Sequence, residues 1–156
     1  MRHLSNERVE TLNRMTERAA LSLEESVVEG PFILEAMFLM AAADGDVSPD
    51  EIERFADSVG SIVHGASEAD VERMLGEMSG LLADEGWDRR TSAVAAALKG
   101  RPGAELAFRL ATTVAFVDDS VADAESSALD EMAMAMGISH ERAHAIMSEV
   151  HDELFG

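Results

Sequence analysis

FILEAMFLMAAADGDVSPDEIERF, residues 32–55, is the stretch that decides the fold of this chain of 156 residues. Its first twelve residues are apolar apart from one Glu, which predicts a helix that is buried on all sides. This apolar run is shorter than the roughly 20 residues that span a bilayer, so we expect a core helix. The letters DGD at 44–46 then predict a turn, and SPDE at 48–51 predicts the start of another helix.

The same pattern is written a second time in residues 106–129, LAFRLATTVAFVDDSVADAESSAL. Each copy is an apolar helix followed by Asp-x-x-Val-x-x-x-Glu, with Asp118 in the place of Asp44 and Glu125 in the place of Glu51. The repeat halves cover about 32–82 and 106–154, and the GRPG connector at 100–103 lies between them. Repeated helical halves usually bury their apolar faces against each other, so the sequence predicts a pseudo-twofold bundle.

The rest of the chain also has the apolar spacing of helices, and no segment alternates with a period of two. We therefore predict one all-α domain over residues 1–156, a bundle of seven or eight helices. Gly30-Pro31 should stop the first helix and Trp87 should be a packing anchor between helices. Seven of the ten methionines should fill gaps in the core: Met37, Met40, Met74, Met78, Met132, Met136 and Met147. Ser67, Asp88 and Ser139 are expected to cap the helices that follow them. The expected helices cover residues 4–29, 32–43, 48–59, 68–82, 89–98, 104–117, 123–136 and 140–154.

The composition excludes several classes of protein. There is no Cys, which excludes a disulfide scaffold and thiolate metal sites, and the first residues lack the apolar run of a secretory signal. A cytoplasmic location is the plain expectation. The net charge of −19 repels nucleic acid and anionic lipid and favours cations and basic partners, although acidity can also serve solubility alone.

A local exception to the acidity lies around the connector, and we name it the basic strip. It can meet an acidic surface, such as that of a second copy in a homodimer, or it can simply be a solvated helix face. Its members are Arg89, Arg90, Lys99, Arg101 and Arg109.

The acidic turns have a structural and a ligand-binding interpretation. In the first turn Ser48 and Glu51 form a capping box, which needs no ligand. In the second turn Ala122 replaces the serine and cannot cap, yet the two carboxylates remain. The Asp of each turn also follows the negative end of an apolar helix, which disfavours an anion. Hard oxygen ligands in such loops suit Ca²⁺ or Mg²⁺, so we predict a divalent-cation site. Its predicted ligands are Asp44, Asp46, Glu51, Asp118 and Glu125.

The first acidic turn matches the second half of an EF-hand loop. The first and third ligand positions of that loop would then be Met40 and Ala42, with Val114 and Phe116 in the second copy. Apolar residues at these positions exclude a true EF-hand. Any ion must be completed by water, by backbone carbonyls or by the carboxylates of the other half.

At these residues the sequence resembles the TerB-like family, named for tellurite resistance. The family pattern is an apolar helix ending in Ala-x-x-Asp-Gly-x-[Ile/Val]-x-x-x-Glu, and it occurs twice. In this chain the two copies read AAADGDVSPDE, ending at Glu51, and AFVDDSVADAE at 115–125. The resemblance extends from Phe32 to about Leu154. Asp119 stands where the family pattern has Gly. The resemblance implies a helical bundle that acts in a bacterial stress response, in the cytoplasm or at the periphery of the inner membrane. It also implies interaction with other proteins rather than catalysis. The divalent-cation ligands that it implies are Asp44, Glu51, Asp118 and Glu125.

An enzyme is the less favoured interpretation. Residues 140–144 spell HExxH, the zinc-protease signature, and His151 lies on the same helix face. The usual third-ligand spacing is missing, so the three His more simply border the core stripe of a terminal helix, with incidental Zn²⁺ or Ni²⁺ binding as an alternative. The chain also lacks the thiols or dinucleotide fingerprint that tellurite reduction would ordinarily need. Two hypotheses remain: a non-enzymatic cation-binding interaction module, and a purely structural interaction or oligomerisation domain without an ion.

Overall fold

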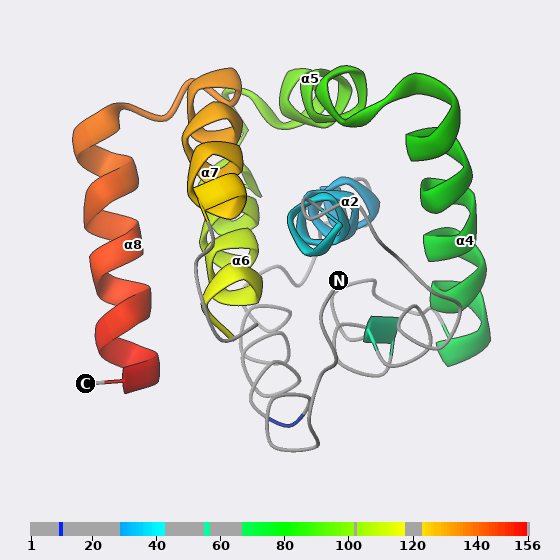
Figure 1. Ribbon diagram of the computed structural model, residues 1–156, viewed down its shortest axis with the longest axis horizontal. Coiled ribbons are helices and arrows are strands. Elements are labelled where there is room, and N and C mark those ends of the chain that lie inside the picture. The colour runs from blue at the N-terminus through cyan, green and yellow to red at the C-terminus, as the bar shows by residue number, and fades with distance from the viewer. Residues whose placement is uncertain are drawn as a thin grey trace.

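The described part of the chain is entirely helical. The computed structural model describes residue 10 and residues 29–42, 55–56, 67–101, 103–117 and 123–155. Within these ranges the helices are α2 (Glu29–Ala41), α4 (Glu68–Glu85), α5 (Trp87–Leu98), α6 (Gly103–Val117), α7 (Asp123–Ala135) and α8 (His140–Phe155) (Figure 1). The predicted all-α fold class is confirmed for these residues. The predicted count of seven or eight helices depends on segments outside them and stays a prediction.

Helix α2 is the centre of the described bundle. Figure 1 shows it nearly end-on, with α5 above it, α6 and α7 on one side and α4 on the other. Every residue from Ile33 to Ala42 is buried, including Glu35. A helix that is apolar on all sides can only be buried on all sides, so the prediction of a central core helix is confirmed. Its most extensive packing is against α6, followed by α5.

The dipeptide Gly30-Pro31 was expected to stop the helix of residues 4–29, and this stays a prediction because the structure describes only residues 10 and 29 of that range. The structure places both residues in the first turn of α2, which begins at Glu29. Proline is tolerated there because the first N–H groups of a helix have no intrahelical partner and its fixed φ already suits the helix. Gly30-Pro31 therefore belongs to the start of the core helix.

The boundaries of the other helices follow their caps. Ser67 caps α4 through a capping box in which its hydroxyl accepts from the Asp70 N–H at 3.2 Å, as predicted for this serine. The predicted cap at Asp88 is wrong, because α5 already begins at Trp87 and Asp88 lies in its first turn. Gly86, with φ +90°, takes the cap position in a backbone conformation that other residues rarely adopt. Helix α4 also continues three residues beyond its expected end, to Glu85.

Helices α6, α7 and α8 stand side by side on one flank of the bundle (Figure 1). Ser139 caps α8 as predicted, since its Oγ accepts from the Arg142 N–H at 3.1 Å. Of the described side chains of α8, those of Ala143, Ile146 and Val150 are buried, and they form the predicted core stripe. All seven methionines expected in the core are buried or packed against it: Met37, Met40, Met74, Met78, Met132, Met136 and Met147.

The predicted repeat finds partial parallels in the burial pattern. Phe55 and Leu129, which occupy matching positions of the two copies, are both fully buried. The two copies of the apolar helix, α2 and α6, pack on each other more extensively than any other described pair. The symmetry of the halves depends on residues 43–54 and 57–66, which lie outside the described residues, so the pseudo-twofold arrangement stays a prediction.

Candidate functional site

The predicted cation ligands fall almost entirely outside the described residues. Asp44, Asp46, Glu51 and Asp118 are not among them, and for Glu125 only the backbone is described, as the third residue of α7. The structure therefore neither brings these carboxylates together nor separates them. What it describes is the frame of helices from which the two acidic turns depart.

The helices on either side of the second acidic turn end and begin where the sequence predicts. Helix α6 ends at Val117 and α7 begins at Asp123, so the chain has residues 118–122 in which to connect them. Asp118 directly follows the last residue of α6 in the sequence, and Glu125 lies in the first turn of α7. The expected order of a helix end, an Asp, a short connection and a Glu at the next helix start is present in the backbone.

The frame also agrees with the exclusion of an EF-hand. The residues at its first ligand positions, Met40 and Val114, lie inside α2 and α6 and are 1% and 5% exposed. Ala42, at the third position of the first copy, is 4% exposed. The side chains of Met, Val and Ala contain no oxygen, and five residues between α6 and α7 cannot hold a twelve-residue loop.

Trp87 holds the end of α2 from which the first acidic turn leaves. The last four carbonyl groups of a helix lack an intrahelical donor. One of these, on Leu39, accepts a hydrogen bond of 2.9 Å from the indole Nε1–H of Trp87. The ring itself packs against the core at the start of α5. Trp87 is therefore an anchor between α5 and α2, as predicted, and it also satisfies a helix carbonyl, which the sequence alone did not indicate.

A buried ion pair joins the same two helices. Arg90 donates from Nε to Glu35 Oε2 at 2.8 Å and from Nη2 to Oε1 at 2.9 Å. The Arg90 side chain is 14% exposed and that of Glu35 is 6% exposed. The hydrogen bond to Glu35 raises the pKa of Arg90 above its usual value, and Glu85 adds to this from 3.5 Å. A bidentate pair with this little exposure fixes α5 on α2 in one orientation.

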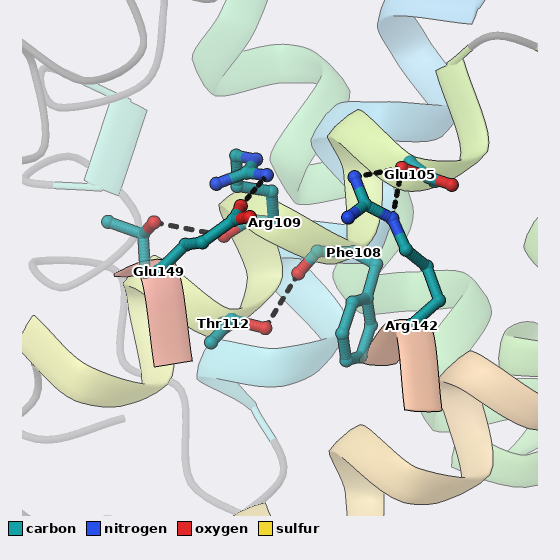
Figure 2. A network of polar contacts seen from close by, with 7 residues as sticks. Glu105, Phe108, Arg109, Thr112, Arg142 and Glu149 are labelled. Atoms are coloured by element: carbon teal, nitrogen blue, oxygen red, sulfur yellow. Dashed lines mark hydrogen bonds and ion pairs between the residues drawn. The ribbon is translucent and has the colours of Figure 1, made fainter. Parts of the chain in front are cut away.

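Two more ion pairs fasten α8 to α6, as Figure 2 shows. Arg142 donates to Glu105 Oε1 from Nε at 3.0 Å and from Nη2 at 2.8 Å, and Arg109 donates from Nη2 to Glu149. Residue numbers rise along both helices from one pair to the next, so α6 and α8 run in the same direction. The bond from Arg109 lowers the pKa of Glu149, and the bond to Glu105 raises the pKa of Arg142.

These contacts revise the basic strip. Two of its five members, Arg90 and Arg109, are neutralised by carboxylates of the same chain. The exposed members are Arg89, Lys99 and Arg101, along α5 and the turn that follows it. The sequence carried one signal that an arginine of the strip would be paired, because the lone Glu35 inside an apolar helix needs a basic partner. It did not indicate which arginine that partner would be.

The HExxH stretch is a surface feature of α8. His140, His144 and His151 are exposed beside the buried stripe, as predicted. The rings of His140 and His144 lie 5.4 Å apart between centres, whereas His151 stands edge-on to Phe116 at 6.0 Å. Nowhere in the described ranges do three or more His, Asp or Glu side chains form a group that could hold a metal ion. The three-ligand arrangement of a zinc protease is therefore not found around this pair.

Comparison with known proteins identifies the family. No helix in the described ranges is both long and apolar enough to cross a membrane. Searches of curated proteins and of solved structures return no match. The family model of tellurite resistance protein TerB matches residues 32–148, a range that contains both acidic turns and runs from the first residues of α2 into α8. This match confirms the resemblance inferred from the repeated motif, and the chain belongs to the TerB family.

Proposed function

We propose that this chain is a non-enzymatic helical module that binds Ca²⁺ or Mg²⁺ through its two acidic turns and interacts with other proteins in a bacterial tellurite-resistance-like stress response. The observation that carries the proposal is the origin of the turns. They leave from the C-terminal ends of α2 and α6, the two described helices that pack most extensively on each other. The predicted ligands are Asp44, Asp46, Glu51, Asp118 and Glu125.

Electrostatics at these helix ends supports a bound cation. The C-terminal end of a helix carries partial negative charge, which disfavours a nearby carboxylate by about 0.3–1 kcal/mol. Neither α2 nor α6 has a basic residue in its last turn to offset this. A divalent cation held by the carboxylates would offset it in both turns.

The rigidity of the frame supports the same proposal. Ligands hold an ion best when the elements that carry them are fixed by packing. The end of α2 is fixed by burial and by the bond from Trp87 to Leu39, and α5 is fixed on α2 by the pair of Arg90 with Glu35. Within α6 the hydroxyls of Thr112 and Thr113 donate to carbonyls one turn earlier, so this buried helix has no unsatisfied hydroxyl there.

A second candidate function is a purely structural interaction domain that uses the basic strip without an ion. The exposure of Arg89, Lys99 and Arg101 on a chain of net charge −19 favours an acidic partner surface, which a second copy of the chain would also present. In this version the acidic turns only cap helices. Sedimentation of the wild type and of Arg89→Glu with Arg101→Glu would test it, since self-association through the strip should be lost in the variant.

The test of the leading proposal is calorimetric titration of metal-stripped protein with Ca²⁺ and with Mg²⁺. We expect saturable binding that is lost in the double variant Glu51→Gln with Glu125→Gln. The matched control is Glu77→Gln with Glu131→Gln, which removes the same charge from exposed positions of α4 and α7. Absence of binding to the wild type, or equal loss in both double variants, would leave the acidic turns as helix caps.

A further inference from the structure

We infer that His140 and His144 form a surface site for a divalent transition metal such as Zn²⁺, separate from the acidic turns. The two residues are one helical turn apart in α8 and both are exposed. Positions i and i+4 of a helix lie on the same side, and imidazole is a ligand that suits Zn²⁺, Ni²⁺ and Cu²⁺. The hard cations proposed for the acidic turns prefer oxygen ligands instead.

The separation of the two rings matches that of two imidazoles on one metal ion. Their centres are 5.4 Å apart and their planes are inclined by 55°. With tetrahedral angles and Zn–N bonds of about 2.0–2.1 Å, the centres of two ligating imidazoles lie roughly 5.2 Å apart. The side-chain conformations therefore bring the rings to the separation of a chelate, where exposed side chains could equally have splayed apart.

The helix beneath the pair is held in place. His140 is the first residue of α8, and the preceding Ser139 accepts from the backbone N–H of Arg142. Between the two His, Arg142 is bonded to Glu105 of α6, and Ala143 is buried against the core. Because the backbone beneath the pair is already fixed, binding of the ion has to order only the two exposed side chains.

The site has two protein ligands. No third His, Asp or Glu joins them among the residues that the structure describes, so water would complete the coordination of the ion. This distinguishes the pair from the three-ligand centre of a zinc protease. The net charge of −19 and the exposed Glu141 beside the pair favour the approach of a cation.

The test is calorimetric titration of the full-length, metal-stripped chain with Zn²⁺. We expect micromolar binding that is weakened at least about tenfold in His140→Ala and in His144→Ala. His151→Ala is the matched control, because it removes an exposed histidine from the same helix, and it should bind like the wild type. Alanine is the best helix former, so these exposed changes should preserve α8, which circular dichroism checks.

A second control keeps the number of histidines and changes only their spacing. His144→Ala combined with Ala145→His moves one ring about 100° around the helix, since both positions are exposed in α8. This variant should bind Zn²⁺ as weakly as His144→Ala alone. Wild-type affinity in the spacing variant, unchanged affinity in His144→Ala, or absence of Zn²⁺ binding to the wild type would each overturn the inference. Loss of Ca²⁺ binding in His144→Ala would show that the pair is not a separate site.

Discussion

Replacing Arg90 with methionine should destabilise the protein more than any comparable change on its surface. Methionine keeps much of the volume and removes the charge, so the Glu35 carboxylate would be left unpaired at a position that is only 5% exposed. Removing one partner of a buried ion pair costs about 3–5 kcal/mol. The free energy of unfolding of a domain of this size is about 5–15 kcal/mol, so the loss of this one contact would remove a large share of the stability.

Urea unfolding followed by circular dichroism measures this effect directly. A domain of this length loses about 2–4 °C of Tm per kcal/mol, so Arg90→Met should also melt roughly 6–20 °C below the wild type. The control is Arg142→Met, the same change in an exposed pair, in which the side chains of Arg142 and Glu105 are 44% and 52% exposed. Water and salt screen such a pair, so the melting temperature of the control should hardly move.

A double variant separates an unpaired charge from lost packing. Glu35→Met combined with Arg90→Met removes both charges, and apolar replacement of a buried ion pair is often neutral or stabilising. The double variant should therefore recover most of the stability that Arg90→Met loses. If the single variant costs less than about 1 kcal/mol, or if the double variant is no more stable than the single one, the argument from the buried carboxylate is refuted.

Three further predictions concern the frame of the acidic turns and the helix caps. Trp87→Phe keeps the ring but leaves the Leu39 carbonyl without its donor, so it should cost about 1–3 kcal/mol in urea unfolding; an unchanged midpoint would contradict the role of this bond. The hydrogen bond from the Ser67 N–H lowers the pKa of Asp70 in the folded protein below its ordinary value of 3.8. The ionised Asp70 therefore stabilises the fold fully above pH 3.8, and this stabilisation is lost as the pH falls through the lower pKa of the folded state. Melting curves of wild type and Asp70→Asn should accordingly differ at pH 7 and converge below pH 3.8, and a constant difference would refute this linkage. Asp118→Asn removes a carboxylate that directly follows the end of α6, so calorimetry should show weaker Ca²⁺ binding while the stability of the metal-free protein is retained; a large loss of metal-free stability would mean that Asp118 is structural.

Local chemistry in the sequence predicted much of the helical organisation. Ser67 and Ser139 cap the helices that follow them, because a short hydroxyl side chain can satisfy a free N–H wherever the chain turns into a helix. The capping expectation failed at Asp88, because Gly86 with its positive φ took the cap position two residues earlier. The expected start of the core helix at residue 32 was three residues late, because Pro31 suits the first turn of a helix.

The sequence predicted which residues belong to the candidate site, but not how they are arranged in space. The repeated Asp-x-x-Val-x-x-x-Glu spacing identifies the acidic turns, and its second copy begins where α6 ends and finishes in the first turn of α7. Spacing along the chain determines which residues share a turn. It does not determine whether Glu51 and Glu125 approach the same ion, because that depends on how the two halves pack.

By itself, the sequence determined that this protein is helical, that its centre is the apolar helix before the first acidic turn, and that three of its five histidines border the core stripe of the last helix. These properties follow from periodicity and composition, which act within a few residues of the chain. The tertiary structure alone decided that Arg90 pairs with Glu35, that Trp87 donates to Leu39 and that α8 runs in the same direction as α6. Each of these contacts joins residues far apart in the sequence, and the choice among many arginines and carboxylates is made only when packing brings two of them into one desolvated place.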